Sequence, residues 1–218
     1  MSTIAVIDYG MGNLRSVAKA LEHVAPRARV VVTSDARAVE QADRVVFPGQ
    51  GAMPDCMREM QARGLRGAIL DAARARPFLG ICIGLQMLFE VSEEGDVPGL
   101  ALMRGTVRRF PAAAMADAGG VRLKVPHMGW NQVAQEREHP LWEGIAQQSR
   151  FYFVHSYYPD PADAAVICGT SRYPFRFTCA VARDNIFAVQ FHPEKSQAAG
   201  LALLRNFSTW DGRVPALA

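Results

Sequence analysis

The sequence feature that most constrains this 218-residue chain is one cysteine at a corner between a strand and a helix. Residues 78–81 form an apolar run of strand length that ends at Cys82. Beyond it, Leu85, Leu88 and Phe89 recur at helical spacing, which predicts a helix that starts at the corner. Such a corner holds the cysteine side chain out from the turn, where it can react.

The residues around Cys82 decide whether its sulfur is reactive. Gly80 and Gly84 leave room for a tight backbone that a Cβ atom would obstruct. The predicted helix points its N-terminus at the sulfur, and its free N–H groups and positive dipole end favour thiolate over thiol. An isolated cysteine is more often a small buried hydrophobic residue, so a catalytic interpretation needs partners from elsewhere in the chain.

The first part of the chain alternates strands with helices. Strands are expected at residues 4–8, 30–32, 45–47 and 78–81, and helices at 14–24 and 65–73. This alternation predicts an α/β fold with a mostly parallel central sheet flanked by helices. In such sheets ligands bind at the carboxyl ends of the strands, and Asp8, the glycine loops and Cys82 all follow strands here.

The second half is richer in strands and has few helices. Short β-rich runs lie around Val133 and at 101–110, 122–125, 151–157, 165–168, 177–182 and 186–191. They predict an additional, partly antiparallel β-rich section. An Ala/Gly-rich stretch at 112–120 is expected to be a surface loop, and residues 198–207 a closing helix. No linker separates the halves, so residues 1–218 are expected to form a single domain.

Charge and cysteine content exclude several classes of protein. The 24 Lys and Arg residues nearly balance the 21 Asp and Glu residues, giving a net charge of +3 that is scattered along the chain. We therefore expect neither nucleic acid nor a membrane as a partner. Four irregularly spaced cysteines and no signal region indicate reduced thiols in the cytoplasm.

The loop after the first strand has two interpretations. Gly10 and Gly12, with Asp35 after the second strand, partly match a dinucleotide-binding fingerprint. Arg15 stands where that fingerprint needs a third glycine, and nothing later in the chain indicates hydride chemistry. A tight turn before a helix, capped by Asn13, is the favoured interpretation, and no cofactor is expected.

A second group of polar residues follows an apolar strand near the other end of the chain. His192 and Glu194 end the stretch 188–194, and their spacing lets both side chains project the same way. A thiol that attacks an amide needs a base, and the base needs an acceptor that orients it. Cys82, His192 and Glu194 can fill these three roles if the fold brings them together. The remaining histidines show no metal-ligand spacing, so we expect no metal site.

Three motifs together resemble the class I, triad-type glutamine amidotransferases: Phe47-Pro48-Gly49-Gln50-Gly51, Gly80-Ile81-Cys82-Ile83-Gly84-Leu85-Gln86 and Phe191-His192-Pro193-Glu194. The resemblance covers essentially the whole chain. It implies a flavodoxin-like α/β domain and hydrolysis of glutamine to glutamate and ammonia. In the roles that it implies, Cys82 attacks the side-chain amide, His192 shuttles the proton and Glu194 orients His192.

The same resemblance assigns the rest of the site. The oxyanion hole would use backbone N–H groups from Gly49, Gln50, Gly51 and Ile83. Four side chains match positions that hold the substrate: Gln86, Tyr152, His155 and Ser156. By sequence alone, the 48–51 loop is also a plain strand-ending turn, Gln86 a polar residue at a helix edge and Tyr152 a core residue.

Within the family, segments 7–14, 126–131 and 192–197 resemble glutaminase subunits that serve histidine biosynthesis. This implies a heterodimer with a separate (βα)8-barrel synthase, which consumes the ammonia. Four residues match positions near that interface: Asn13, Arg15, Trp130 and Lys195. The family also implies that a peptide flip in the 49–51 loop switches activity on. A stand-alone hydrolase of γ-glutamyl substrates and a non-catalytic module on the same scaffold remain the alternatives.

Overall fold

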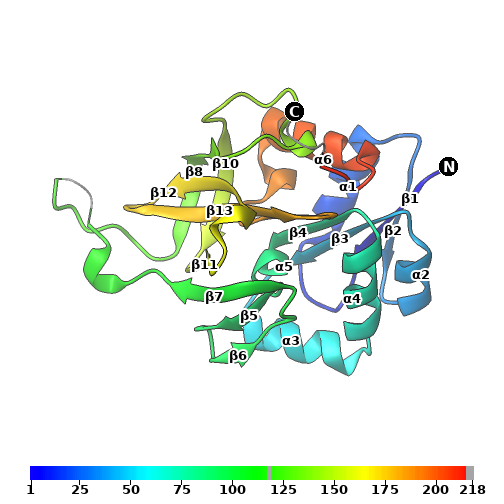
Figure 1. The fold of residues 1–218 in the computed structure, drawn as a ribbon, viewed down its shortest axis with the longest axis horizontal. Coiled ribbons are helices and arrows are strands. Elements are labelled where there is room, and N and C mark those ends of the chain that lie inside the picture. Colours follow the sequence, from blue (N-terminus) through cyan, green and yellow to red (C-terminus); the bar gives the residue numbers. More distant parts are fainter. Residues whose placement is uncertain (117–118, 215–218) are drawn as a thin grey trace.

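The computed structural model describes residues 1–116 and 119–214, and its centre is one twisted sheet (Figure 1). The strand order is β2-β1-β3-β4-β14-β13-β12-β9. From β2 to β14 neighbouring strands are parallel, and from β14 to β9 they are antiparallel. The strands span β1 Thr3–Ile7, β2 Arg29–Thr33, β3 Arg44–Gly49, β4 Phe78–Cys82, β9 Ala134–Gln135, β12 Ile167–Arg172, β13 Arg176–Arg183 and β14 Ile186–Val189.

Two smaller sheets are built from residues 89–161. One has the order β11-β7-β5-β6, and the other pairs β10 with β8 in antiparallel fashion. Their strands span β5 Phe89–Ser92, β6 Val97–Pro98, β7 Met103–Arg109, β8 His127–Gln132, β10 Arg150–His155 and β11 Tyr157–Pro161.

Helices cover the parallel part of the central sheet. In Figure 1, α1 and α6 lie above the parallel strands, and α3 and α4 lie below them. The α-helices span α1 Leu14–Val24, α2 Ala36–Gln41, α3 Met53–Ala62, α4 Arg66–Ala75, α5 Ile83–Gln86 and α6 Gln197–Thr209. Short 3-10 turns occur at η1 Ala112–Ala114, η2 Pro140–Trp142, η3 Ala164–Val166 and η4 Pro193–Lys195. None of the described helices is long and apolar enough to cross a lipid bilayer.

Burial explains why the parallel strands carry nearly unbroken apolar runs. Every residue of β4 and β14 is buried, as are all of β1 and β3 except their first residues. A strand that is covered on both faces has no solvent-facing side, so its sequence does not alternate between apolar and polar residues. The predicted α/β class, with a parallel sheet and an antiparallel section, is confirmed.

Some local predictions are confirmed and others are wrong. The first helix has the predicted bounds, 14–24. Asn13 makes no side-chain cap to it and instead accepts a hydrogen bond from Ser16 Oγ at 2.9 Å. Asp35 caps α2 by accepting from the backbone N–H of Arg37 at 3.0 Å. The acidic residue of the partial dinucleotide fingerprint is therefore a helix cap.

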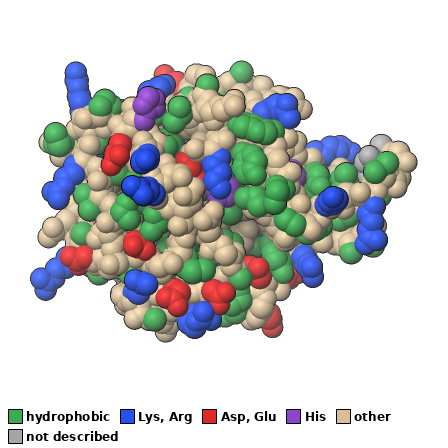
Figure 2. All heavy atoms as spheres, turned by 180° about the vertical axis from the view of Figure 1, so that it is seen from behind, with side chains coloured by type: hydrophobic (Ala, Val, Ile, Leu, Met, Phe, Trp, Pro, Cys, Tyr) green, Lys and Arg blue, Asp and Glu red, His purple; other side chains and the backbone are tan. Residues whose placement is uncertain are grey.

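The predicted strand at 122–125 is wrong. Among the described residues, the β-type pairing of this segment is one isolated bridge, between Ala116 and Arg122, and the segment belongs to an arm that projects from the body (Figure 1). No strand among the described residues lies beside it to complete a ladder. Figure 2 shows that the surface of this projecting arm carries Lys and Arg side chains. The predicted surface loop at 112–120 begins with η1, and its residues 117–118 lie outside the described part of the chain.

The predicted helix after Cys82 lasts a single turn. It ends at Gln86, and Phe89 already starts strand β5. Leu85, Leu88 and Phe89 are all fully buried, so their spacing reflects burial in two successive elements rather than one helix face. A four-residue helix also has a far smaller dipole than the sequence suggested, because the dipole sums over aligned peptides.

The corner depends on close approach of two backbone segments. A Cβ atom added to Gly84 would overlap the carbonyl oxygen of Phe47 in the neighbouring strand β3. Backbone cannot move aside as a flexible side chain can. Glycine at position 84 therefore lets α5 lie directly against β3, which sets where Cys82 and the end of β3 meet.

We predict that Gly84→Ala lowers the free energy of unfolding by about 3 kcal/mol, because overpacking against backbone cannot relax. Urea unfolding followed by circular dichroism measures this change. Gly67→Ala in α4 is the matched control, since a Cβ there meets no atom within 4 Å. It should leave stability equal or raise it by up to about 1 kcal/mol. Equal unfolding midpoints for Gly84→Ala and wild type would contradict the packing constraint.

Candidate active site

The carboxyl ends of three adjacent parallel strands meet at one edge of the central sheet. Strand β4 lies between β3 and β14. Gly49 at the end of β3 is in register with Cys82, and Val189 of β14 is in register with Ile81. His192 follows three residues after Val189. The sheet thus brings Cys82 and His192, which are 110 residues apart, to the same edge.

Cys82 has an unusual backbone conformation. It is the last residue of β4 and the N-cap of α5, with φ of 57° and ψ of −113°. Non-glycine residues rarely adopt positive φ because the Cβ atom crowds the backbone, and such strain persists only where surrounding structure enforces it. The side chain is mostly buried, with 5% of the residue exposed. This backbone strain lowers the stability of the fold, and the packing around Cys82 holds it in place.

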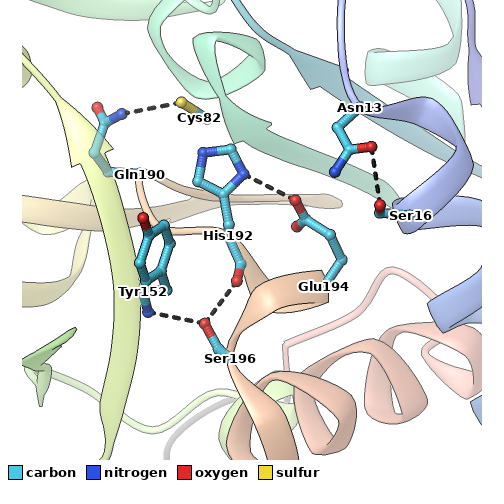
Figure 3. A network of polar contacts seen from close by, with 8 residues as sticks. All are labelled: Asn13, Ser16, Cys82, Tyr152, Gln190, His192, Glu194 and Ser196. Carbon is cyan, nitrogen blue, oxygen red and sulfur yellow. Dashed lines mark hydrogen bonds and ion pairs between the residues drawn. The ribbon is translucent and has the colours of Figure 1, made fainter. Parts of the chain in front are cut away.

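His192 is held in one orientation by its neighbours (Figure 3). Its Nδ1 lies 2.9 Å from Oε1 of Glu194, and both side chains are almost completely buried. Its backbone N–H donates to the carbonyl of Tyr152 at 2.9 Å, and its own carbonyl accepts from Ser196 Oγ at 2.6 Å. The ring therefore presents its other nitrogen, Nε2, in a fixed direction.

That nitrogen faces Cys82. Figure 3 shows the Cys82 sulfur beside the His192 ring, on the side away from Glu194. Among the described residues, Nε2 has no partner at normal hydrogen-bond geometry, so it is free to exchange a proton with a reacting group. Burial disfavours the charged imidazolium, but the Cys82 sulfur and the Glu194 carboxylate outweigh it and raise the pKa of His192 to about 10. The ring therefore carries a proton at neutral pH, and its Nε2 can donate that proton to a reacting group.

Cys82 and His192 line a cavity of about 350 Å³, which is large enough for a small amino acid. Its wall comes from six parts of the chain: the loop after β3, the β4–α5 corner, Glu94, Pro126 before β8, the segment around β10 and β11, and His192 after β14. The lining residues are Gln50, Gly51, Cys82, Ile83, Gln86, Glu94, Pro126, Val154, His155, Ser156, Tyr157 and His192.

Three of the residues expected to hold substrate, Gln86, His155 and Ser156, line this cavity. Tyr152 does not line it. The Tyr152 ring instead packs edge-on against Trp130, with ring centroids 6.2 Å apart, and Lys195 Nζ lies 5.9 Å from its centre.

Two buried glutamines stand beside the nucleophile, and sequence reasoning identified only one. Gln86 Nε2 donates to Gln190 Oε1 at 3.0 Å, and Gln190 Nε2 lies 3.7 Å from Cys82 Sγ. Gln190 is completely buried at the end of an otherwise apolar strand. A polar residue in that context is the signal that could have indicated it, because a buried amide needs partners.

The loop after β3 lies beside the sulfur. Gly51 has φ of 99°, a conformation that favours glycine, and the Gln50 carbonyl accepts from the Cys56 thiol at 3.4 Å. Gly49 lies against the buried Tyr9 hydroxyl, which has no hydrogen-bond partner among the described residues. Ile83 supplies the first N–H of α5, which has no acceptor within the helix. The loop after β3 and the first turn of α5 thus both border the cavity next to Cys82.

The expected interface residues lie around the outside of the triad. Asn13 precedes α1, and Figure 3 shows it near Glu194. Arg15 is exposed on the first turn of that helix. Trp130 is 38% exposed on β8, and Lys195 follows Glu194 in η4. The three segments that carry these residues are far apart in sequence.

The arrangement suits acyl transfer. It combines a cysteine thiol, an imidazole that can exchange a proton beside it, a carboxyl group that orients the imidazole, and the free first N–H of α5. Within residues 1–116 and 119–214, no three His, Cys, Asp or Glu side chains gather as a metal site would require.

Comparison with known proteins agrees with this chemistry. The sequence model of the family "Glutamine amidotransferase class-I" matches residues 5–209. The imidazole glycerol phosphate synthase subunit HisH of Nitrosospira multiformis is 68% identical over 210 residues, 96% of this chain and 99% of that protein. The protein of the same name from Aromatoleum aromaticum is 67% identical with the same coverage.

Solved structures support the fold. A putative GMP synthase protein from Thermoplasma acidophilum matches with a TM-score of 0.69 at 18% identity, covering 95% of this chain and 92% of that one. PurLQS from Thermotoga maritima matches with a TM-score of 0.68 at 17% identity, covering 94% and 97%. The chain therefore belongs to the class I glutamine amidotransferase family, and within it to the HisH subunits of imidazole glycerol phosphate synthase.

Proposed function

We propose that this chain hydrolyses glutamine to glutamate and ammonia and passes the ammonia to a (βα)8-barrel synthase subunit that makes imidazole glycerol phosphate in histidine biosynthesis. The observation that carries the proposal is the alignment of Cys82, His192 and Glu194 at one sheet edge, opening on a cavity of substrate size. The name shared by the relatives, HisH, supports the pathway and the partnership.

The first half of the reaction forms a thioester. The Cys82 sulfur attacks the side-chain amide carbon of glutamine, and the carbonyl oxygen becomes an oxyanion. His192 gives its Nε2 proton to the amide nitrogen, and the C–N bond breaks. Ammonia departs, and the glutamyl group remains bound to Cys82 as a γ-glutamyl thioester. Glu194 stays ionised and keeps the Nδ1–H of His192 directed at itself, which holds Nε2 toward the reacting atoms.

The second half releases glutamate. A water molecule attacks the thioester carbon while Nε2 of His192 accepts its proton. The C–S bond then breaks, glutamate leaves, and the thiolate–imidazolium pair is restored. The backbone N–H of Ile83 and one N–H from Gly49, Gln50 or Gly51 stabilise the oxyanion in both halves. Loss of one such donor typically costs about 10² to 10³ in rate.

Charge in the cavity fits the free end of the substrate. Among the described lining residues Glu94 is the only carboxylate, and its Oε2 accepts from the Met53 backbone N–H at 2.8 Å. Its negative charge complements the α-ammonium group of glutamine. Gln86, His155 and Ser156 line the same cavity, and the buried Oε1 of Gln86 has no partner among described residues, so it can accept from the substrate.

The face around β8 fits the docking site for the synthase. Met128 is 63% exposed and Trp130 38% exposed on the same side of β8, so a partner can bury both. Figure 2 shows apolar side chains gathered near the middle of one face, among scattered charges. Lys195 packs near Trp130 through Tyr152. Its η4 turn contacts α1, which carries Arg15 and is preceded by Asn13.

The loop at 49–51 is where the partner could control the reaction. Its two glycines allow a peptide to rotate, and a rotated peptide exchanges a carbonyl for an N–H beside the sulfur. Four cysteines are free and buried, which fits a reducing compartment, and we place the reaction in the cytoplasm. The whole chain acts as one catalytic domain in this scheme.

We predict that Cys82→Ala abolishes ammonia release from glutamine in the assembled synthase, because no other side chain can form the thioester. Synthesis from added ammonium salt should continue at the wild-type rate. Cys168→Ala is the matched control, a buried thiol outside the cavity that should keep glutamine hydrolysis. Glutamine hydrolysis by the Cys82→Ala complex would overturn the proposal, as would its absence in wild type.

We predict that Glu194→Gln lowers kcat by roughly 10²-fold to 10⁴-fold, since the base loses its orienting carboxylate. The pH profile gives an independent measure. Because the pKa of His192 is raised to about 10, the imidazolium persists through neutral pH and is lost as pH rises through that value. Removing the Glu194 charge lowers this pKa, so the alkaline decline in kcat should begin at lower pH.

The control is Glu143→Gln, a carboxylate that is exposed near η2. Its kcat and its pH profile should equal those of wild type, measured as ammonia release with the synthase present. A Glu194→Gln profile that declines at the same pH as wild type would show that Glu194 does not set the protonation of His192.

A further inference from the structure

Two buried histidines outside the triad form part of a continuous polar chain. His127 on β8 and His155 on β10 are 3% and 5% exposed, and they face each other across the two strands. Nδ1 of His127 lies 2.9 Å from Nε2 of His155, and Nδ1 of His155 lies 2.8 Å from the Tyr157 carbonyl. The catalytic steps above use neither imidazole as an acid or a base.

The partners of each nitrogen fix the direction of every hydrogen bond. A carbonyl only accepts, so His155 must carry its proton on Nδ1 and offer Nε2 as an acceptor. His127 must then donate from Nδ1, which leaves its Nε2 as an acceptor. Asn131 Nδ2 lies 3.2 Å from that atom and supplies the proton. The chain therefore runs one way, from Asn131 through both histidines to the Tyr157 carbonyl.

The surroundings keep both rings neutral, as this direction requires. The His127 ring stacks between Tyr173 at 4.0 Å and Phe153 at 5.0 Å, centroid to centroid. Burial lowers the pKa of His127 to about 4 and that of His155 to about 3. A second proton on either ring would place two donors against each other.

The inner end of the chain reaches the nucleophile. The Tyr157 carbonyl also accepts from Gln86 Nε2 at 3.3 Å. Since both Gln86 amide protons are then used, on Tyr157 and on Gln190 Oε1, Gln190 must turn its Nε2 toward the Cys82 sulfur. The reverse orientation would set a carbonyl oxygen against a thiolate.

The outer end of the chain lies at the surface. Asn131 is half-buried on β8 and also donates to the Arg172 carbonyl at 3.0 Å. It immediately follows Trp130. The side chains of Trp130 and Met128 form an exposed apolar surface on β8. Movement of this strand would therefore be transmitted to Nε2 of His127.

We propose that His127 and His155 form a one-way hydrogen-bond relay that positions the Gln86–Gln190 amide pair beside the Cys82 sulfur, and that couples strand β8 to the reactivity of the nucleophile. The proposal rests on the proposed role of Cys82. His127 and His155 are positioning residues here, since both act through the Tyr157 carbonyl and the two amides.

The relay can be tested first without any substitution. Nitrogen-15 spectra of the histidine side chains in the full-length chain at neutral pH report which ring nitrogen carries the proton. His127 and His155, identified by the peaks that disappear in single variants, should both be protonated on Nδ1 only. In water the other tautomer, protonated on Nε2, is favoured. An Nε2–H tautomer at either residue would overturn the relay.

Two substitutions of His127 separate the relay from packing. His127→Phe keeps a ring between Tyr173 and Phe153 but removes the donor to His155. His127→Asn loses the stacked ring, but its side-chain amide can place an N–H near the position of Nδ1. If His127 matters only for packing, the Phe variant should be the more stable and the more reactive of the two.

The relay predicts the opposite order of reactivity. The rate of Cys82 alkylation by iodoacetamide at pH about 7 should fall about tenfold in His127→Phe, the usual effect of losing one buried hydrogen bond. His127→Asn should lie closer to wild type even where its melting temperature is lower. Glutamine hydrolysis in the complex should follow the same order, mainly through kcat.

The control is His23→Phe on the exposed end of α1, which should alkylate at the wild-type rate. Equal alkylation rates in wild type and His127→Phe would overturn the relay, as would a faster rate in Phe than in Asn. Alkylation and tautomers are measured without glutamine. A chain that fails to hydrolyse glutamine but shows these results therefore refutes the proposed function and leaves the relay standing.

Discussion

The pairing of β4 with β14 is the interaction on which the rest of the structure depends. This parallel ladder joins a strand from the first half of the chain to one near its end, and its register sets how far His192 lies from Cys82. A slip of one residue would turn every buried side chain of β14 to the other face of the sheet. Both faces of β14 are packed against other parts of the protein, so this slip is strongly disfavoured. Core packing therefore fixes the position of His192 relative to Cys82.

The second constraint is electrostatic. A thiol group, an imidazole and a carboxyl group lie almost without solvent exposure at one edge of the sheet, where an unpaired charge would be costly. They are tolerable as a set because each faces an opposite charge or a hydrogen-bond donor. Gln190 adds an N–H toward the sulfur, and Ser196 anchors the backbone of His192. The strained backbone at Cys82 is held by this same packing.

Much of this could be predicted from the sequence, for definable reasons. Continuous apolar runs such as β4 and β14 identify buried parallel strands, and strand ends are where a sheet places side chains that act together. The single-turn helix after Cys82 could not be predicted, because Leu88 and Phe89 are buried in a turn and a strand while keeping helical spacing. Gln190 and the His127–His155 pair were missed because a polar network depends on which strands become neighbours.

The position of β14 in the sheet also has a consequence for synthesis of the protein. The first 82 residues can form a four-stranded sheet, β2-β1-β3-β4, in which β4 is the open edge. That edge carries the apolar sequence Phe-Leu-Gly-Ile-Cys, and only β14, made about a hundred residues later, can close it. An unpaired apolar edge invites pairing with other chains. During synthesis there is thus a period in which Cys82 has been made but His192 has not. In that period the unpaired edge of β4 is exposed, and a chaperone that covers it would prevent pairing with other chains.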